Sequence, residues 1–183
     1  MVDERKAFSA GLLHYGKLKG VANYIAVTGP KDKEADEICG YYGEKLVLLA
    51  QTMNIKSCWV GASYSKKHTK VDLAPNQRLI IAIGLGYSDQ AGNPHRSKDF
   101  DEVATVKAPP APQWFNDGVR AALLAPTAIN QQKFHLTLTD QKDSEGRLIV
   151  ELERKRGPYS RVDAGIVRYH FEVAAGKDNF AWA

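Results

Sequence analysis

Apolar residues recur at helical spacing in the first third of the chain. From Lys33 to Met53 they fall three or four positions apart, which predicts one long helix with an apolar face. These positions are Ile38, Tyr42, Leu46, Leu49, Ala50 and Met53. Gly40 and Gly43 lie inside the pattern, where each costs about 1 kcal/mol relative to alanine. We therefore expect another part of the chain to approach this helix closely.

Strand patterns lie on both sides of this helix. Residues 24–27 form an apolar strand that Gly29 and Pro30 close, and residues 57–60 form a second strand after the helix. Residues 79–83 are a continuous apolar run, which predicts a strand buried on both faces.

A shorter helix and a strand follow in the second half. Val119, Ala122 and Leu123 predict an amphipathic helix over residues 116–125, which Pro126 ends. Apolar residues at 134, 136 and 138 alternate with polar ones, which is the period of a half-buried strand.

The turn between these two elements, residues 125–132, carries the most informative chemistry. It crowds the carboxamides of Asn130, Gln131 and Gln132 beside the hydroxyl of Thr127. Amides both donate and accept hydrogen bonds, so they match the alternating C=O and N–H groups on the pyrimidine edge of a flavin. The same residues are equally typical of a loop whose amides cap backbone groups. The turn alone leaves both interpretations open.

Composition indicates one ordinary domain. With 183 residues and 44% hydrophobic content, the chain can bury roughly 70% of its unfolded surface. Its net charge of +4 suits phosphorylated ligands but is far too small to indicate nucleic acid. Two cysteines are too few for a disulfide framework. No run approaches the ~20 apolar residues of a membrane span, so we expect a cytoplasmic protein.

The segment from Trp114 to Gln132 resembles the flavin-contacting turn of FMN-dependent nitroreductases, whose pattern is Pro-Thr/Ser-x-x-Asn-x-Gln. It is most similar to nitroreductases that fuse two such halves in one polypeptide. Further blocks resemble that family in the same order: Gly43 to Gln51, Ser57 to Gly61, Ile83 to Tyr87, Asp163 to Ile166 and Tyr169 to Glu172. The resemblance covers nearly the whole chain.

The resemblance implies an α+β nitroreductase-like fold, with helices flanking a central, mostly antiparallel sheet. It implies FMN as cofactor, NAD(P)H as hydride donor and a nitroaromatic or quinone-like acceptor, in a ping-pong cycle without a catalytic side chain. The chain would be a monomer whose halves form a pseudo-dimer, or a homodimer. The alternative function is a non-catalytic or degenerate flavin-binding protein.

The resemblance also implies which residues contact the flavin. They are Pro126, Thr127, Ala128, Asn130, Gln131 and Gln132 in the turn, Trp59, Val60 and Gly61 in the strand beside the ring, and Tyr42 and Gly43 near its N5 atom. Trp59 is equally compatible with core packing, and Tyr42 with packing on the helix surface.

The phosphate contacts are less complete. Family members open with an Arg-x-Ser-x-Arg cluster that clamps the FMN phosphate, and Arg5 and Lys6 do not reproduce it. We therefore expect a chain shortened at its N-terminus and weaker FMN binding. Arg96 and Lys98, in the loop after Gly86, are candidate phosphate ligands, although a solvated loop fits them as well.

An internal repeat supports the two-half interpretation. The pattern Gly40-x₄-Lys45-Leu46-x₃-Ala50 aligns with Gly165-x₄-His170-Phe171-x₃-Ala175. We expect one nitroreductase-like domain over residues 1–183, in which residues 1–107 are the late part of the first half and 113–183 the early part of the second. Residues 108–112, with three prolines, form a stiff connector.

Other chemistries find little support. The chain has no Gly-x-Ser-x-Gly elbow, and its histidines and cysteines lack metal-ligand spacing. Gly84 and Gly86 lack the third glycine of a dinucleotide fingerprint. Cys58 is more typical of a small buried residue than of a nucleophile.

Overall fold

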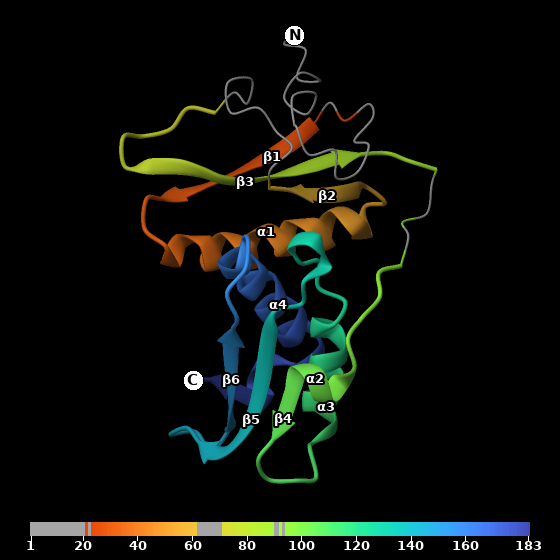
Figure 1. Cartoon of the computed structure of the whole chain (residues 1–183), viewed down its shortest axis with the longest axis vertical. Coiled ribbons are helices and arrows are strands. Elements are labelled where there is room, and N and C mark those ends of the chain that lie inside the picture. The colour runs from red at the N-terminus through yellow and green to blue at the C-terminus, as the bar shows by residue number, and fades with distance from the viewer. Residues whose placement is uncertain (1–20, 22, 62–70, 90–91, 93) are drawn as a thin grey trace.

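The computed structural model describes residues 21, 23–61, 71–89, 92 and 94–183. The predicted first helix is α1 (Glu34–Thr52), and the three strands around it are β1 (Asn23–Pro30), β2 (Lys56–Val60) and β3 (Gln77–Gly86). These strands form an antiparallel sheet in the order β1-β3-β2, and α1 packs on it (Figure 1). The expectation for the N-terminal segment with Arg5 and Lys6 lies outside the described residues.

A second, mixed sheet follows in the order β4-β5-β6-β7. Its strands are β4 (Ala104–Val106), β5 (Phe134–Lys142), β6 (Leu148–Arg154) and β7 (Phe180–Trp182). β5 and β6 form an antiparallel hairpin, whereas β4 pairs with β5, and β7 with β6, in parallel. The helices α3 (Gln113–Ala122) and α4 (Ser160–Ala175) make the two parallel connections, and the short α2 (Phe100–Val103) precedes β4.

The fold class is therefore confirmed as α+β, with three antiparallel and two parallel pairings among the described strands, divided between two sheets. The continuous apolar run of β3 is buried as predicted, because residues 80–84 are all buried in the structure. The predicted helix over residues 116–125 begins earlier, at Gln113, and ends at Ala122.

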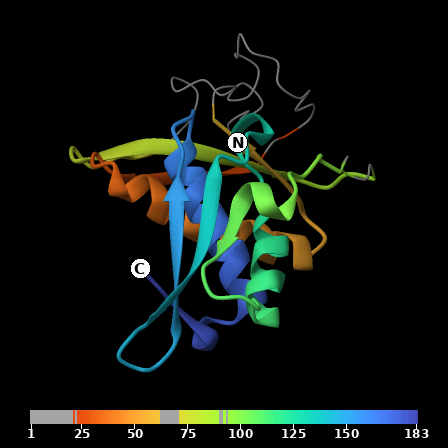
Figure 2. The same ribbon diagram turned by 60° about the horizontal axis from the view of Figure 1, so that its bottom comes forward.

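The core lies mainly around α4. Phe171 of α4 is fully buried and makes edge contacts with Phe115 of α3 and Phe180 of β7, with ring centroids 5.8 and 5.1 Å apart. Figure 2 shows α4 behind β5 and β6, with α3 beside it. The contact with Phe115 joins elements far apart in the sequence, and aromatic side chains contribute a large share of the buried apolar area.

In the long helix α1, the small residues are buried and the large apolar residues are exposed. Its buried residues are Ala35, Gly40, Gly43, Glu44 and Ala50, of which four are small. The larger apolar residues that defined the predicted apolar face are exposed: Ile38, Tyr42, Leu46, Leu49 and Met53 have exposed fractions of 43–61%. The helix was predicted correctly, but within the described structure its apolar stripe faces outward, because the small residues are needed where α4 crosses.

Two glycines make that crossing possible. A Cβ atom at Gly40 would lie 2.1 Å from the carbonyl oxygen of Val162 in α4, and one at Gly165 would lie 1.9 Å from that of Glu37 in α1. The close backbone approach expected at Gly40 is therefore confirmed. Gly43 accommodates a side chain instead, since its Cβ would lie 2.4 Å from the ring of Trp59.

Candidate functional site

The amide-rich turn after α3 folds through its own hydrogen bonds. The backbone N–H of Asn130 donates to the Thr127 carbonyl at 2.9 Å, and that of Gln132 donates to the Thr127 hydroxyl at 3.0 Å. Ile129, Asn130 and Gln132 all have positive φ angles, between 43° and 53°. Non-glycine residues adopt this left-handed region rarely, and asparagine does so more readily than most. The turn is thus a specific structure rather than a loose end of the helix.

Asp163 of α4 attaches the turn to that helix. Its carboxylate accepts hydrogen bonds from the Ala128 N–H at 3.1 Å and from the Gln131 amide at 2.6 Å. The side chain is buried, and burial raises the pKa of Asp163 to about 6, although these two hydrogen bonds act in the opposite direction. The turn is thus held by a carboxylate whose pKa is raised to about 6.

Gln131 faces inward, toward the start of α4. Its amide nitrogen also donates to the Pro158 carbonyl at 2.8 Å. Its Oε1 atom is buried and has no hydrogen-bond partner among the described residues. That oxygen lies against Gly157, where a Cβ atom would come within 2.2 Å of it. Gln131 therefore holds the turn on the segment that leads into α4.

The loop with the two candidate phosphate ligands lies against the same turn. The carbonyl oxygen of Arg96 accepts hydrogen bonds from the Asn130 and Gln132 amides, both at 2.9 Å. The backbone N–H of Lys98 donates to Gln132 Oε1 and its amino group donates to the Gln132 carbonyl, again at 2.9 Å. Gln132 is 2% exposed, so its side chain is used to bind the loop of Arg96 and Lys98 to the turn. The Arg96 carbonyl and the Lys98 side chain are thus held at the turn.

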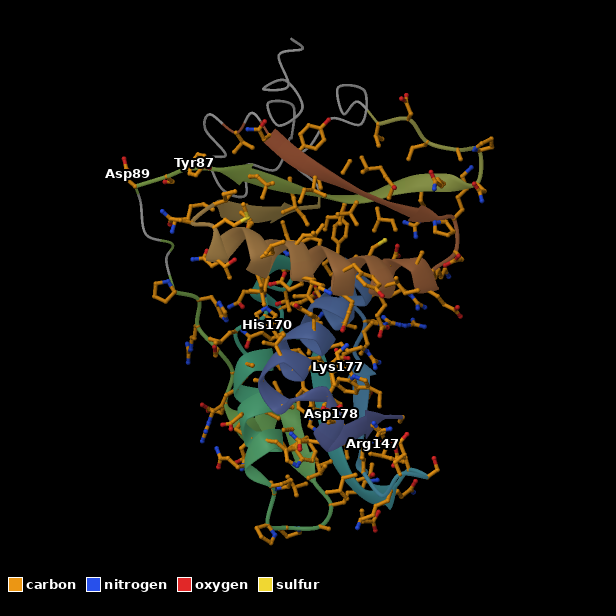
Figure 3. The ribbon with its side chains drawn as sticks, turned by 180° about the vertical axis from the view of Figure 1, so that it is seen from behind. Tyr87, Asp89, Arg147, His170, Lys177 and Asp178 are labelled. Carbon is orange, nitrogen blue, oxygen red and sulfur yellow. The ribbon has the colours of Figure 1, made fainter. Side chains whose placement is uncertain are left out.

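The strand residues of the candidate site are held by α1 and by the start of α4. The Trp59 indole donates to Glu44 Oε2 at 2.8 Å, and His170 of α4 contacts the other Glu44 oxygen at 2.8 Å. Glu44 is 1% exposed, and two charge-assisted contacts compensate for its burial. Figure 3 shows His170 on α4 close to α1. At the end of β2, the Tyr159 hydroxyl donates to the Gly61 carbonyl.

Most candidate residues therefore converge on the start of α4. Gly61 reaches it through Tyr159, and Gln131 reaches it through Pro158 and Asp163. Arg96 and Lys98 join through the turn. Tyr42 is 59% exposed and packs edge-on against Tyr41 with ring centroids 5.3 Å apart. Within the described structure, Tyr42 makes no hydrogen bond or ring contact with the turn.

Sequence reasoning did not single out Asp163, Tyr159 or Glu44 as parts of the site. Asp163 is the one carboxylate among the apolar residues 162–167, and this could have marked it as a buried group with a partner. Glu44 gave no such indication, because its partners Trp59 and His170 are distant in the sequence.

Among the described residues, no group of three His, Cys, Asp or Glu side chains could hold a metal ion. No helix in the described part is long and apolar enough to cross a membrane.

Comparisons with known proteins identify the family and the fold. The model of the family described as "Putative TM nitroreductase" matches residues 1–175. The structure is similar to the crystal structure of a protein from Thermotoga maritima described as a putative nitroreductase, with a TM-score of 0.61 and 20% sequence identity. The match covers 86% of this chain and 63% of that one, so this chain spans less than two thirds of its structural relative. A search of curated proteins found no match.

Proposed function

We propose that this chain, which belongs to the family described as "Putative TM nitroreductase", is an FMN-dependent oxidoreductase. In this proposal NAD(P)H reduces the flavin, and a small nitroaromatic or quinone-like molecule takes up the electrons. The observation that carries the proposal is the junction of Asn130 with Arg96. One residue offers an amide for a heterocycle edge, and the other offers a guanidinium for a phosphate.

The residues present fit the two ends of FMN. Asn130 is exposed at the turn, and its Oδ1 accepts one hydrogen bond from Gln132, which leaves further acceptor capacity. The Arg96 side chain is exposed, and within the described part of the chain its guanidinium has no hydrogen-bond or ion-pair partner. Leu124 and Ile129, in the same connection between α3 and β5 as Asn130, are 65% and 63% exposed. Exposed apolar side chains next to free polar groups are typical of a ligand surface.

Bound FMN would supply the hydride-accepting chemistry, and the protein would supply position and charge. Asn130 would orient the pyrimidine edge, and Arg96 would neutralise the phosphate. Asp163 and Gln131 would keep the turn in place from behind, because their hydrogen bonds fix it to α4. Glu44 and His170 would hold Trp59 on the strand beside the ring. Lys98 is less available to a phosphate, since its amino group already donates to Gln132.

One observation favours the alternative of a non-catalytic flavin-binding protein. The amide nitrogens of Gln131 and Gln132 already donate to protein acceptors, and Gln132 is almost completely buried. The turn therefore offers fewer free amides than its composition predicts. Such a protein would still bind FMN through Asn130 and Arg96, but NAD(P)H would not reduce the bound flavin at a useful rate.

Titration of the chain with FMN, followed by flavin fluorescence, tests the binding part of this proposal. Asn130→Ala and Arg96→Ala are each expected to weaken binding about tenfold or more, because each removes a polar contact, charged in the case of Arg96. Asn76→Ala and Arg120→Ala replace exposed residues outside the turn and serve as matched controls. Equal affinities for all five proteins, each folded, would contradict the assignment of the turn as a flavin site.

A further inference from the structure

A pocket of about 540 Å³ lies where the starts of α1 and α4 meet β3 and the end of β6. Its charged lining residues are Lys33, Arg78, Arg154, Arg156 and Arg161, with Asp36 as the one carboxylate. Gly157 and Tyr159 also line it, so it adjoins the segment that supports the amide turn. The volume falls within the range of small-molecule sites and exceeds what one phosphate ion fills.

The positive charge of this pocket is only partly compensated within the protein. Arg78 pairs with Asp36, with Nη2 and Oδ1 2.5 Å apart, and Arg154 donates to the neutral Ser160 hydroxyl at 2.9 Å. Lys33, Arg156 and Arg161 have no acidic partner among the described residues. Several cations around one pocket repel one another, and an anionic ligand would relieve that repulsion.

The start of α4 supplies backbone hydrogen-bond donors beside these positively charged side chains. Ser160, Arg161 and Val162, the first three residues of this 16-residue helix, line the pocket, and no side chain caps its N-terminus. By contrast, Asp32 caps α1 by accepting the Ala35 N–H at 2.7 Å. The acidic residue in the first turn of α4, Asp163, is committed to the amide turn instead. The Ser160 N–H donates to the Gly157 carbonyl at 3.3 Å, which leaves the N–H groups of Arg161 and Val162 without an acceptor among the described residues. Free N–H groups at a helix N-terminus favour anions, and here they coincide with the arginines.

We infer that this pocket binds a small ligand with a diphosphate group, either free or as part of a nucleotide. Arginine forks bind phosphate oxygens in pairs, and Arg156 and Arg161 provide two such forks beside the helix N-terminus. A diphosphate can contact more of these cations than a single phosphate can, because they lie on three elements, β3, β6 and α4, and on the segments that precede α1 and α4. The inference does not depend on the proposed flavin function, since Arg156 and Arg161 differ from the residues assigned to FMN.

Calorimetric titration of the full chain at low salt tests this site, with inorganic phosphate, pyrophosphate, ADP and adenosine as ligands. Pyrophosphate is expected to bind more tightly than phosphate, and adenosine is not expected to bind. The double variant Arg156→Gln/Arg161→Gln should lose on the order of a hundredfold in pyrophosphate affinity, since two charge-assisted contacts disappear. The matched control Lys107→Gln/Arg120→Gln removes two exposed cations elsewhere and should keep the affinity.

The ADP result distinguishes the two sources of the diphosphate. Tighter binding of ADP than of pyrophosphate indicates a nucleotide, and equal binding indicates a free diphosphate. The variant should unfold at the same temperature as the parent or higher, because it relieves repulsion, and its FMN affinity should be unchanged. Absence of pyrophosphate binding, or an equal loss in the control variant, would overturn the inference. If only FMN binding failed, the inference of a diphosphate site would be unaffected.

Discussion

Gly40 of α1 and Gly165 of α4 lie against each other's helices in a reciprocal manner. Each glycine faces the carbonyl of the residue three positions before the other, at Val162 and Glu37. These are the same two glycines that the internal repeat aligns. The crossing leaves no room for a side chain at either position, and it sets where β2 and the amide turn lie relative to the start of α4.

Replacing either glycine by alanine is expected to destabilise the fold by roughly 1–3 kcal/mol or more, because the added Cβ forces the helices apart. Helix propensity alone predicts the opposite sign, a gain of about 1 kcal/mol. Urea denaturation measures the difference. Gly86→Ala is the control, since a Cβ there meets no atom within 4 Å. Stabilisation by Gly40→Ala and Gly165→Ala would show that the crossing is looser than described.

Stability is also expected to depend on Asp163. Because its pKa rises from 3.8 unfolded to about 6 folded, the folded state binds the proton more tightly. This stabilisation is complete below pH 3.8 and is lost as the pH rises through about 6. The ionised side chain thus costs about 3 kcal/mol at neutral pH.

The Asp163→Asn variant should remove this part of the pH dependence while keeping an oxygen to accept the Ala128 N–H. Thermal unfolding of the parent and the variant between pH 4 and pH 7 measures the effect. Asp117→Asn, which alters a half-exposed carboxylate on α3, is the control. Parallel curves for the parent and Asp163→Asn would contradict the role given to this residue.

Local periodicity was enough to predict the long helix α1, the strands around it and the close approach at Gly40. It could not show which face of α1 meets a partner, and the large apolar residues between Ile38 and Met53 are exposed. Periodicity identifies an apolar stripe, but packing decides what covers it. The small residues that α4 requires could be recognised only once the two helices were placed together.

The candidate site shows the same limit. The amide turn and the loop with Arg96 were both identified from residue types and from the resemblance, and the structure brings them into contact. Their attachment through Asp163 and the Trp59–Glu44–His170 contacts depends on pairs separated by 15 to 126 positions. No local pattern encodes such pairs, because they join elements that meet only in the folded chain.

Reductase turnover is not expected to require a cysteine. Cys58 is exposed, not buried as the sequence predicted. Partial desolvation still raises the pKa of its thiol, so little nucleophilic thiolate forms at neutral pH. Cys58→Ala should therefore retain most NAD(P)H-dependent activity and FMN binding. Loss of activity in a variant that still folds and binds FMN would indicate a thiol step that the flavin mechanism does not include.

Anaerobic mixing of the FMN-loaded chain with NADPH, and separately with NADH, tests the central claim most directly. We predict that at least one of them bleaches the oxidised flavin absorbance, and that a quinone or nitroaromatic added afterwards restores it, as a ping-pong reductase requires. Arg120→Ala should behave like the parent. A chain that binds FMN but whose flavin stays oxidised with both nucleotides would contradict the oxidoreductase proposal and favour a non-catalytic flavin-binding protein.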